Sequence, residues 1–287
     1  LVFGISSCSS DSDDDDDDDS GSSSSVTLPA SVGTNPFSGK TWGASSSYYS
    51  SYISSSIAFS SNTVTISYTY SADTDTFTYS YSYDADKGLL YMAVKGGSTT
   101  IGSNTYTFSS ISDYKSYASS VLGESGAELD KDVADVTQMF NTMTVYKYEI
   151  SSDSSLTMYS YFNGLPTAVD FDYDKDNLEI ESENGGFVMQ YYGDSSGTIK
   201  YYIYPTFSNG TFSGTMYKRV YDSNNEKVYS TLGTASGTYT TSGTGTSGCT
   251  ITIKFTTLPD GVTGFAANTA YTLSQNDNNG GTLSLKQ

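Results

Sequence analysis

Two tyrosine-rich segments alternate strictly between large side chains and small polar ones, and this alternation strongly constrains the fold. The segments are residues 63–70 and 76–83. Because successive side chains of a β-strand point to opposite faces of a sheet, a period of two predicts two strands with one buried face each. The large side chains on these faces are Val64, Ile66, Tyr68 and Tyr70 in the first segment, and Phe77, Tyr79, Tyr81 and Tyr83 in the second.

The same rhythm recurs through most of the 287 residues, with short apolar or aromatic segments separated by Gly, Asn, Asp and Ser. The 27 Tyr and 13 Phe supply much of the area available for burial, since each aromatic side chain buries about 150–250 Å². The pattern predicts a mainly-β fold. We expect an antiparallel meander that forms a barrel, followed by further antiparallel structure as a second barrel or a sandwich.

One stretch, residues 112–143, breaks the strand rhythm. Leu129, Val133, Val136 and Phe140 recur there at helical spacing, with acidic residues on the far side. This spacing predicts a helical insertion packed against one end or side of the barrel. A lid over a ligand site is the alternative interpretation.

The chain is strongly acidic, with 13 basic and 32 acidic residues and a net charge of -19. The negative electrostatic field of such a protein repels phosphate backbones, so nucleic acids are not expected partners. Neutral partners such as glycans or apolar molecules, or else cationic ones, are favoured.

The first five residues are largely apolar, and Ser6, Ser7 and Cys8 follow. This order is typical of the end of a secretory signal peptide, so residues 1–7 are interpreted as its remnant. Residues 5–8, Ile-Ser-Ser-Cys, resemble the lipobox of bacterial lipoproteins. The resemblance implies cleavage before Cys8, a diacylglyceryl group on its sulfur, a fatty acyl chain such as palmitate on its amine, and anchorage in the outer membrane. A disulfide between Cys8 and Cys249 is the alternative.

Residues 9–25 consist almost entirely of Ser, Asp and Gly. A segment of this composition cannot bury enough apolar area to fold, so we expect a disordered tether. An export signal and loose cation binding by the Asp run are alternatives. The expected divisions of the chain are the signal remnant at 1–7, the lipidated Cys8 and tether at 8–27, a first β domain at 28–166, and a second β-rich region at 167–287, separate from the first or continuous with it.

Residues 36–42, Pro-Phe-Ser-Gly-Lys-Thr-Trp, followed by a meander, resemble the opening of lipocalin-like (calycin) barrels. Together with Tyr-Lys-Tyr-Glu-Ile at 146–150 they also resemble the lipocalin-like repeats of spirochaete-type lipoproteins. The likeness covers residues 36–166. It implies a barrel around a small-molecule cavity, with Trp42 across the closed end. The spacing from Gly39 to Trp42 is one residue longer than the family's Gly-x-Trp.

The chain has no His, which removes the usual general base, the commonest zinc ligand and every Ser-His or Cys-His pair. Asp172, Asp174, Asp176 and Glu183 match acidic positions of a calcium loop, yet Asn177 replaces its central Gly, and a hairpin turn accounts for the same residues. We therefore expect no metal, no cofactor and no enzymatic activity. A hydrolase that uses two carboxylates is the remaining catalytic alternative.

These observations predict a membrane-anchored, non-catalytic binding module for a small neutral ligand or a glycan. The alternative is a structural or adhesive coat protein that contacts host molecules or neighbouring copies. An inner cavity would favour the first function, and a filled core with an exposed aromatic strip would favour the second. The candidate ligand-binding residues are those of the tyrosine stripes, Tyr68, Tyr70, Tyr79, Tyr81 and Tyr83.

Overall fold

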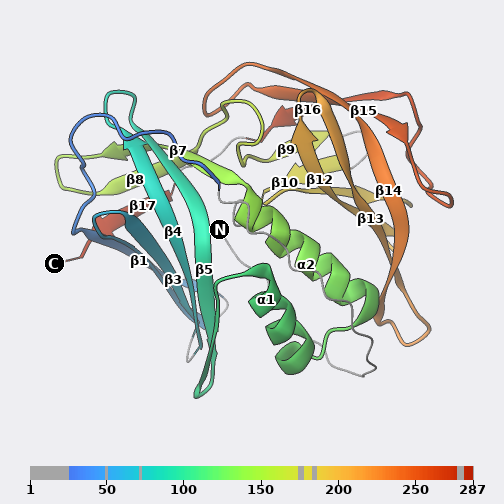
Figure 1. The fold of residues 1–287 in the computed structure, drawn as a ribbon, viewed down its shortest axis with the longest axis horizontal. Helices are drawn as coiled ribbons and strands as arrows, with labels where there is room; N and C mark the ends of the chain where they lie inside the picture. The colour runs from blue at the N-terminus through green and yellow to red at the C-terminus, as the bar shows by residue number, and fades with distance from the viewer. Residues whose placement is uncertain are drawn as a thin grey trace.

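The computed structural model describes residues 26–48, 51–70, 73–173, 178–182, 186–276 and 281–286, with side chains except at 45–48, 51–53 and 70. Cys8 and the acidic segment after it lie outside the described residues. Two closed antiparallel barrels of eight strands each make up the body, which confirms the mainly-β prediction (Figure 1). Within the described residues, no helix is long and apolar enough to cross a bilayer.

The first barrel closes where β4 pairs with β5. A short extra strand, β6 (Asn104–Phe108), extends the sheet beside β5. The strands around the barrel are β1 (Thr41–Tyr48), β2 (Ser51–Phe59), β3 (Thr63–Tyr70), β4 (Asp73–Asp84), β5 (Leu89–Ile101), β7 (Met143–Ile150), β8 (Leu156–Ser160) and β17 (Gly281–Leu285).

The second barrel closes where β16 pairs with β9. Its strands follow one another in chain order around the barrel. They are β9 (Phe171–Tyr173), β10 (Leu178–Glu181), β11 (Val188–Tyr192), β12 (Lys200–Ser208), β13 (Thr211–Tyr221), β14 (Lys227–Ser242), β15 (Thr250–Thr257) and β16 (Ala270–Gln275).

The second barrel is inserted into the first. The chain leaves the first barrel after β8, builds the whole second barrel, and returns as β17, which pairs with both β1 and β8. Residues 281–286 therefore belong to the first barrel, although a division of the sequence at residue 166 groups them with the second region. Alternation within β17 resembles that of any other short strand, so the sequence pattern gave no sign of this return.

The helical insertion lies between the two barrels, as Figure 1 shows. It consists of α1 (Ile111–Tyr117), a π-helical turn over Ala118–Leu122 and α2 (Gly126–Asn141). Helix α2 packs on both sides, because Val136 and Met139 join the first core and Ala134 packs on the outer face of the second barrel. The Gln138 side-chain amide also donates to the Pro205 carbonyl at 2.6 Å. The insertion predicted from helical spacing is thus confirmed.

The predicted tyrosine hairpin forms between β3 and β4, with Val64 opposite Tyr79 and Ile66 opposite Phe77. These side chains belong to the core of the first barrel, whose members lie on alternate positions of each strand. In the second barrel, alternating buried positions such as Ile251, Ile253 and Phe255 of β15 build an equally continuous core. The apolar faces of the strands therefore point inward in both barrels.

Candidate functional site

Two of the predicted ligand-binding tyrosines engage the protein's own backbone at one end of the first barrel. Tyr81 is 8% exposed. Its hydroxyl donates to the Ser60 carbonyl at 2.8 Å and accepts from the Asn35 amide at 2.9 Å. The Tyr83 hydroxyl donates to the Gly33 carbonyl at 3.4 Å. These phenols close the barrel rather than point into open space.

The other described tyrosines of the stripe lie deeper in the first barrel. Burial raises the pKa of Tyr79 well above its ordinary value, and the nearby phenols of Tyr146 and Tyr68 raise it further. Burial likewise raises the pKa of Tyr146 to about 12, with a contribution from Asp170. Tyr68 is half-buried, and the side chain of Tyr70 lies outside those described. Tyr146 of the first core therefore lies near Asp170, the carboxylate that immediately precedes β9 of the second barrel.

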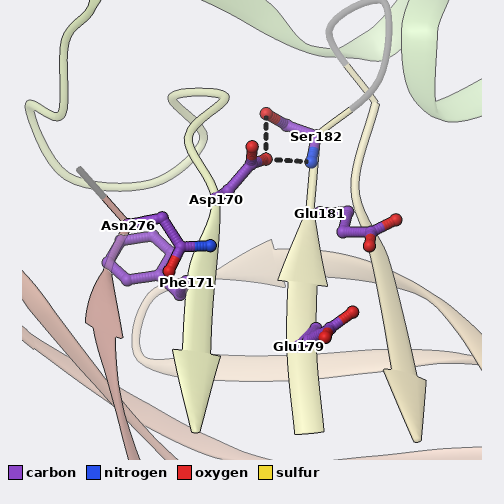
Figure 2. Close-up of a pocket in the computed structure, with 6 residues that line it drawn as sticks. All are labelled: Asp170, Phe171, Glu179, Glu181, Ser182 and Asn276. Atoms are coloured by element: carbon purple, nitrogen blue, oxygen red, sulfur yellow. Dashed lines mark hydrogen bonds between the residues drawn. The ribbon is translucent and has the colours of Figure 1, made fainter. Parts of the chain in front are cut away.

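That carboxylate, Asp170, lines a polar pocket of about 250 Å³ on the outside of the second barrel. Strand alternation positions its neighbours: Leu178 and Ile180 of β10 are fully buried in the second core, so Glu179 and Glu181 point outward. Figure 2 shows the pocket and the strands from which its residues come. The lining residues are Asp170, Phe171, Glu179, Glu181, Ser182 and Asn276.

Hydrogen bonds fix the geometry of this pocket. Asp170 accepts from the backbone N–H of Ser182 at 2.8 Å and from its hydroxyl at 3.2 Å, as drawn in Figure 2. Burial raises the pKa of Asp170, the Ser182 hydrogen bonds counteract this, and Glu179 raises the pKa again. Glu181 accepts from the side-chain amide of Gln190 on β11. The Asn276 backbone N–H donates to the Asp170 carbonyl at 3.1 Å.

The pocket presents carboxylate, amide and hydroxyl groups around one aromatic residue. Such groups accept hydrogen bonds from hydroxylated or cationic ligands, because an ionised carboxylate has only acceptor oxygens. Over the described ranges, no three His, Cys, Asp or Glu residues are arranged to hold a metal ion. Asp174, Asp176, Asn177 and Glu183 of the calcium-like motif lie outside those ranges, while Asp172 pairs with Glu179 across β9 and β10.

A second carboxylate pair occurs in the helical insertion. Burial, together with the charge and hydrogen bond of Asp132, raises the pKa of Glu124 to about 8. Glycosidases hold their two carboxyl groups about 5–9.5 Å apart so that a sugar bond or a water fits between them. Asp132 also forms an ion pair with Lys131, so its carboxylate is already engaged within the insertion.

Cys249 is buried immediately before β15, where burial raises the pKa of its thiol. A thiol of raised pKa is a poor nucleophile at neutral pH, so the side chain acts as a small apolar residue. Its proposed lipid-bearing counterpart, Cys8, lies outside the described residues.

Sequence reasoning did not single out Asp170, Glu179, Glu181, Ser182 or Asn276. The available signal was the outward position of acidic residues on two adjacent short strands, which is equally typical of solvent-exposed strand faces. What the sequence could not provide is that the ends of β9, β10 and β16 come together around one hollow. No protein-family model, no curated protein and no solved structure matches this chain.

Proposed function

We propose that this protein is a membrane-anchored, non-catalytic binding module that takes a neutral, hydroxyl-rich ligand, such as a glycan, in the pocket formed by Asp170, Glu179, Glu181, Ser182 and Asn276. The observation that carries the proposal is the pocket itself, with its convergent polar side chains outside the barrel wall. Binding sites of this kind are concave and use a few well-placed polar groups to orient the ligand.

The packing of the barrels supports a site on the outside. Large aromatic residues occupy the interior of the first barrel, where the Phe37 and Phe59 rings stack with centroids 4.6 Å apart. In the second barrel the Phe212 and Phe255 rings meet edge to face at 5.3 Å. Side chains packed to this density leave little volume for an enclosed ligand. The Tyr79 and Tyr81 positions therefore contribute to the core in this proposal.

The chemistry of the pocket supports a sugar more than an apolar ligand. Sugar hydroxyls donate hydrogen bonds to carboxylate and amide oxygens. The pocket offers such oxygens from Asp170, just before β9, from Glu179 on β10 and from Asn276, just after β16. An apolar molecule would bury these groups without hydrogen bonds, at a cost of about 1–3 kcal/mol for each. The net charge of -19 also disfavours anions at this acidic surface.

Binding of neutral oligosaccharides on an array, followed by calorimetry with the best ligand, tests the pocket. We expect Glu179→Gln and Asn276→Ala to weaken binding about tenfold or more, because a hydrogen bond to a charged group contributes about 1.5–3 kcal/mol. The matched control is Glu149→Gln, which removes one exposed carboxylate from β7 of the first barrel and should leave affinity unchanged. Equal losses in all three variants, or no neutral sugar bound, would contradict the proposal.

The anchor rests on residues 5–8 and on their resemblance to a lipobox, as in spirochaete-type lipoproteins. Each methylene of a fatty chain in the bilayer contributes about 0.8 kcal/mol, so several chains on Cys8 suffice for stable attachment. We expect the mass of the membrane-extracted N-terminal peptide to include a diacylglyceryl group and an acyl chain. Cys8→Ser should release the protein into the aqueous phase of a detergent partition. An unmodified thiol on Cys8, or a bond to Cys249, would contradict lipidation.

A second candidate function is adhesion to host molecules or to neighbouring copies. The filled cores favour it, and so do tyrosines on the outer face of β11–β14. Tyr221 is 38% exposed, and Tyr192, Tyr202 and Tyr229 are half-buried. In that case these tyrosines, rather than the pocket, would make the main contacts. Binding that survives the pocket variants unchanged would support this function.

A further inference from the structure

Two cations lie directly opposite each other on the outer face of the second barrel. Lys200 of β12 and Arg219 of β13 are partners in the strand ladder, and Tyr192 of β11 is the partner of Lys200 on its other side. Like charges at opposite positions of a sheet repel each other and destabilise it. Only 13 of the 287 residues are basic, so this pairing of two of them in an acidic protein needs a physical reason.

No carboxylate of the described residues forms an ion pair with either cation. The ion pairs found there are Lys87–Asp84 and Lys131–Asp132. The nearest acidic residues along the chain are engaged in their own turns. Asp194 accepts from hydroxyl groups and the Ile199 backbone N–H, and Asp222 accepts from two backbone N–H groups of the β13–β14 turn. The cation pair is therefore not neutralised within the described part of the chain.

The guanidinium of Arg219 is largely buried, and only part of its hydrogen-bonding capacity is used. The residue is 8% exposed, and its Nη2 donates to the Gly197 carbonyl at 2.9 Å. Its Nε is buried and has no acceptor among the described residues. Since buried donors are nearly always hydrogen-bonded, the guanidinium of Arg219 keeps donor capacity that the described residues do not use.

Tyrosine rings lie against both cations. The ammonium nitrogen of Lys200 lies 4.9 Å from the ring centroid of Tyr192 and 5.3 Å from that of Tyr202. The guanidinium carbon of Arg219 lies 4.7 Å from the ring centroid of Tyr221. These contacts hold the cations in position, because the face of an aromatic ring attracts positive charge. We call these five residues, Tyr192, Lys200, Tyr202, Arg219 and Tyr221, the tyrosine–cation face.

We propose that the tyrosine–cation face binds the sulfate or carboxylate of an acidic glycan, with the anionic group between Lys200 and Arg219 and the sugar against the neighbouring rings. An oxyanion there neutralises the opposed charges and accepts hydrogen bonds from the Lys200 ammonium and the Arg219 guanidinium. Arginine suits this role because its planar fork matches the oxygens of carboxylate and sulfate. Tyr221, at 38% exposure, offers a ring edge or face beside the anion.

The negative overall charge of the protein favours binding of an isolated anionic group over binding of a polyanionic surface. A protein with a net charge of -19 is repelled by nucleic acid and by anionic bilayers, whose charges extend well beyond one site. A single sulfate or carboxylate on an otherwise neutral sugar experiences the local cations most strongly, since salt screens the distant acidic residues. This inference does not rest on the pocket of the proposed function, which lies on β9, β10 and the end of β16.

Affinity measurements on the full chain, with Cys8→Ser to remove the lipid, test the inference. The probes are a neutral tetrasaccharide that carries a single sulfate, its desulfated counterpart, sodium sulfate, and phosphatidylglycerol vesicles. We expect the sulfated sugar alone to bind well, with affinity that falls as salt is added. Lys200→Gln should weaken it about tenfold. The matched control, Lys254→Gln, removes an exposed lysine from β15 of the same barrel and should change affinity less than about twofold.

Further variants separate the possible outcomes. Tyr221→Leu should weaken the sulfated sugar while leaving any sulfate binding unchanged, and Glu179→Gln in the pocket should alter neither. The inference is overturned if the neutral counterpart binds equally well, if sodium sulfate competes at the same concentration as the sugar, or if vesicles bind and the sugar does not. It is also overturned if Lys200→Gln and Lys254→Gln behave alike. Failure of the pocket variants to affect neutral sugars bears only on the proposed function.

Discussion

A chain shortened to end at Asn276 is expected to lose the first barrel and keep the second. Strand β17 pairs with β1 on one side and with β8 on the other, so its removal opens the barrel and leaves two unpaired edges. Leu283 and Leu285 also leave the first core, to which they pack. The loss in the free energy of unfolding of the first barrel should approach the whole stability of a small domain, about 5–15 kcal/mol. Hydrogen exchange with mass spectrometry should show rapid exchange in β1–β8 and protection in β10–β15.

A matched pair of point substitutions tests the same closure without shortening the chain. Leu283 faces the core, whereas its neighbour Ser284 is exposed on the outer face. Leu283→Asp places a charge against apolar side chains and should destabilise the first barrel by about 3–5 kcal/mol. Ser284→Asp should change stability by less than about 0.5 kcal/mol, as surface substitutions usually do. Equal effects of the two, or full protection of β1–β8 in the shortened chain, would show that β17 is dispensable.

The second large effect is expected for Trp42→Ala. Trp42 is fully buried, its indole N–H donates to the Ser154 carbonyl at 2.8 Å, and its ring meets Phe37 and Phe59 edge to face. Truncating a buried tryptophan leaves a cavity that the neighbouring rings cannot fill, which typically costs about 3–5 kcal/mol. Because this is the sole Trp, thermal unfolding should be followed by circular dichroism or calorimetry.

Trp42→Phe separates the two contributions of the indole. It retains a ring in the core but leaves the Ser154 carbonyl without its donor, so we expect a smaller loss of about 1–3 kcal/mol. An alanine variant within about 1 kcal/mol of the parent would mean that the closed end of the barrel is held mainly by Phe37, Tyr81 and Tyr148. The free energies would be obtained from denaturant curves of all three proteins under the same conditions.

The strands and their inner faces could be predicted from the sequence because burial in a barrel follows a period of two. Val64, Ile66 and Tyr79 lie inside as that period requires. The inward position of Tyr81 was also predictable, but its partner was not. Ser60 lies 21 residues away on the turn before β3, and the register that pairs Thr63 with Ser80 brings that carbonyl to the phenol. A barrel with a cavity lined by tyrosine hydroxyls and a barrel with a filled end show the same alternation of large and small residues along their strands.

The candidate sites depend on neighbours that are distant in sequence, and here the pattern was less informative. Asp170 and Asn276 are separated by the whole second barrel, yet closure of β16 onto β9 brings them into hydrogen-bond distance. The opposition of Lys200 and Arg219 depends on the register of a long hairpin. A shift of that register by one residue would turn the cations to opposite faces. The charged and polar residues could be seen in the sequence, but the register with which their strands pair could not.

The insertion of the second barrel into the first also sets an order of assembly. During synthesis β1–β8 emerge early, but β17 is made only after every strand of the second barrel. The second barrel, whose strands pair with their chain neighbours until the final closure, can fold while the first is still an open sheet. The contact between β1 and β17 spans most of the sequence, and contacts of such long range slow folding and expose unpaired strands in the meantime. Folding of this protein is therefore expected to benefit from a chaperone that covers the edges of β1 and β8 until the last strand is made.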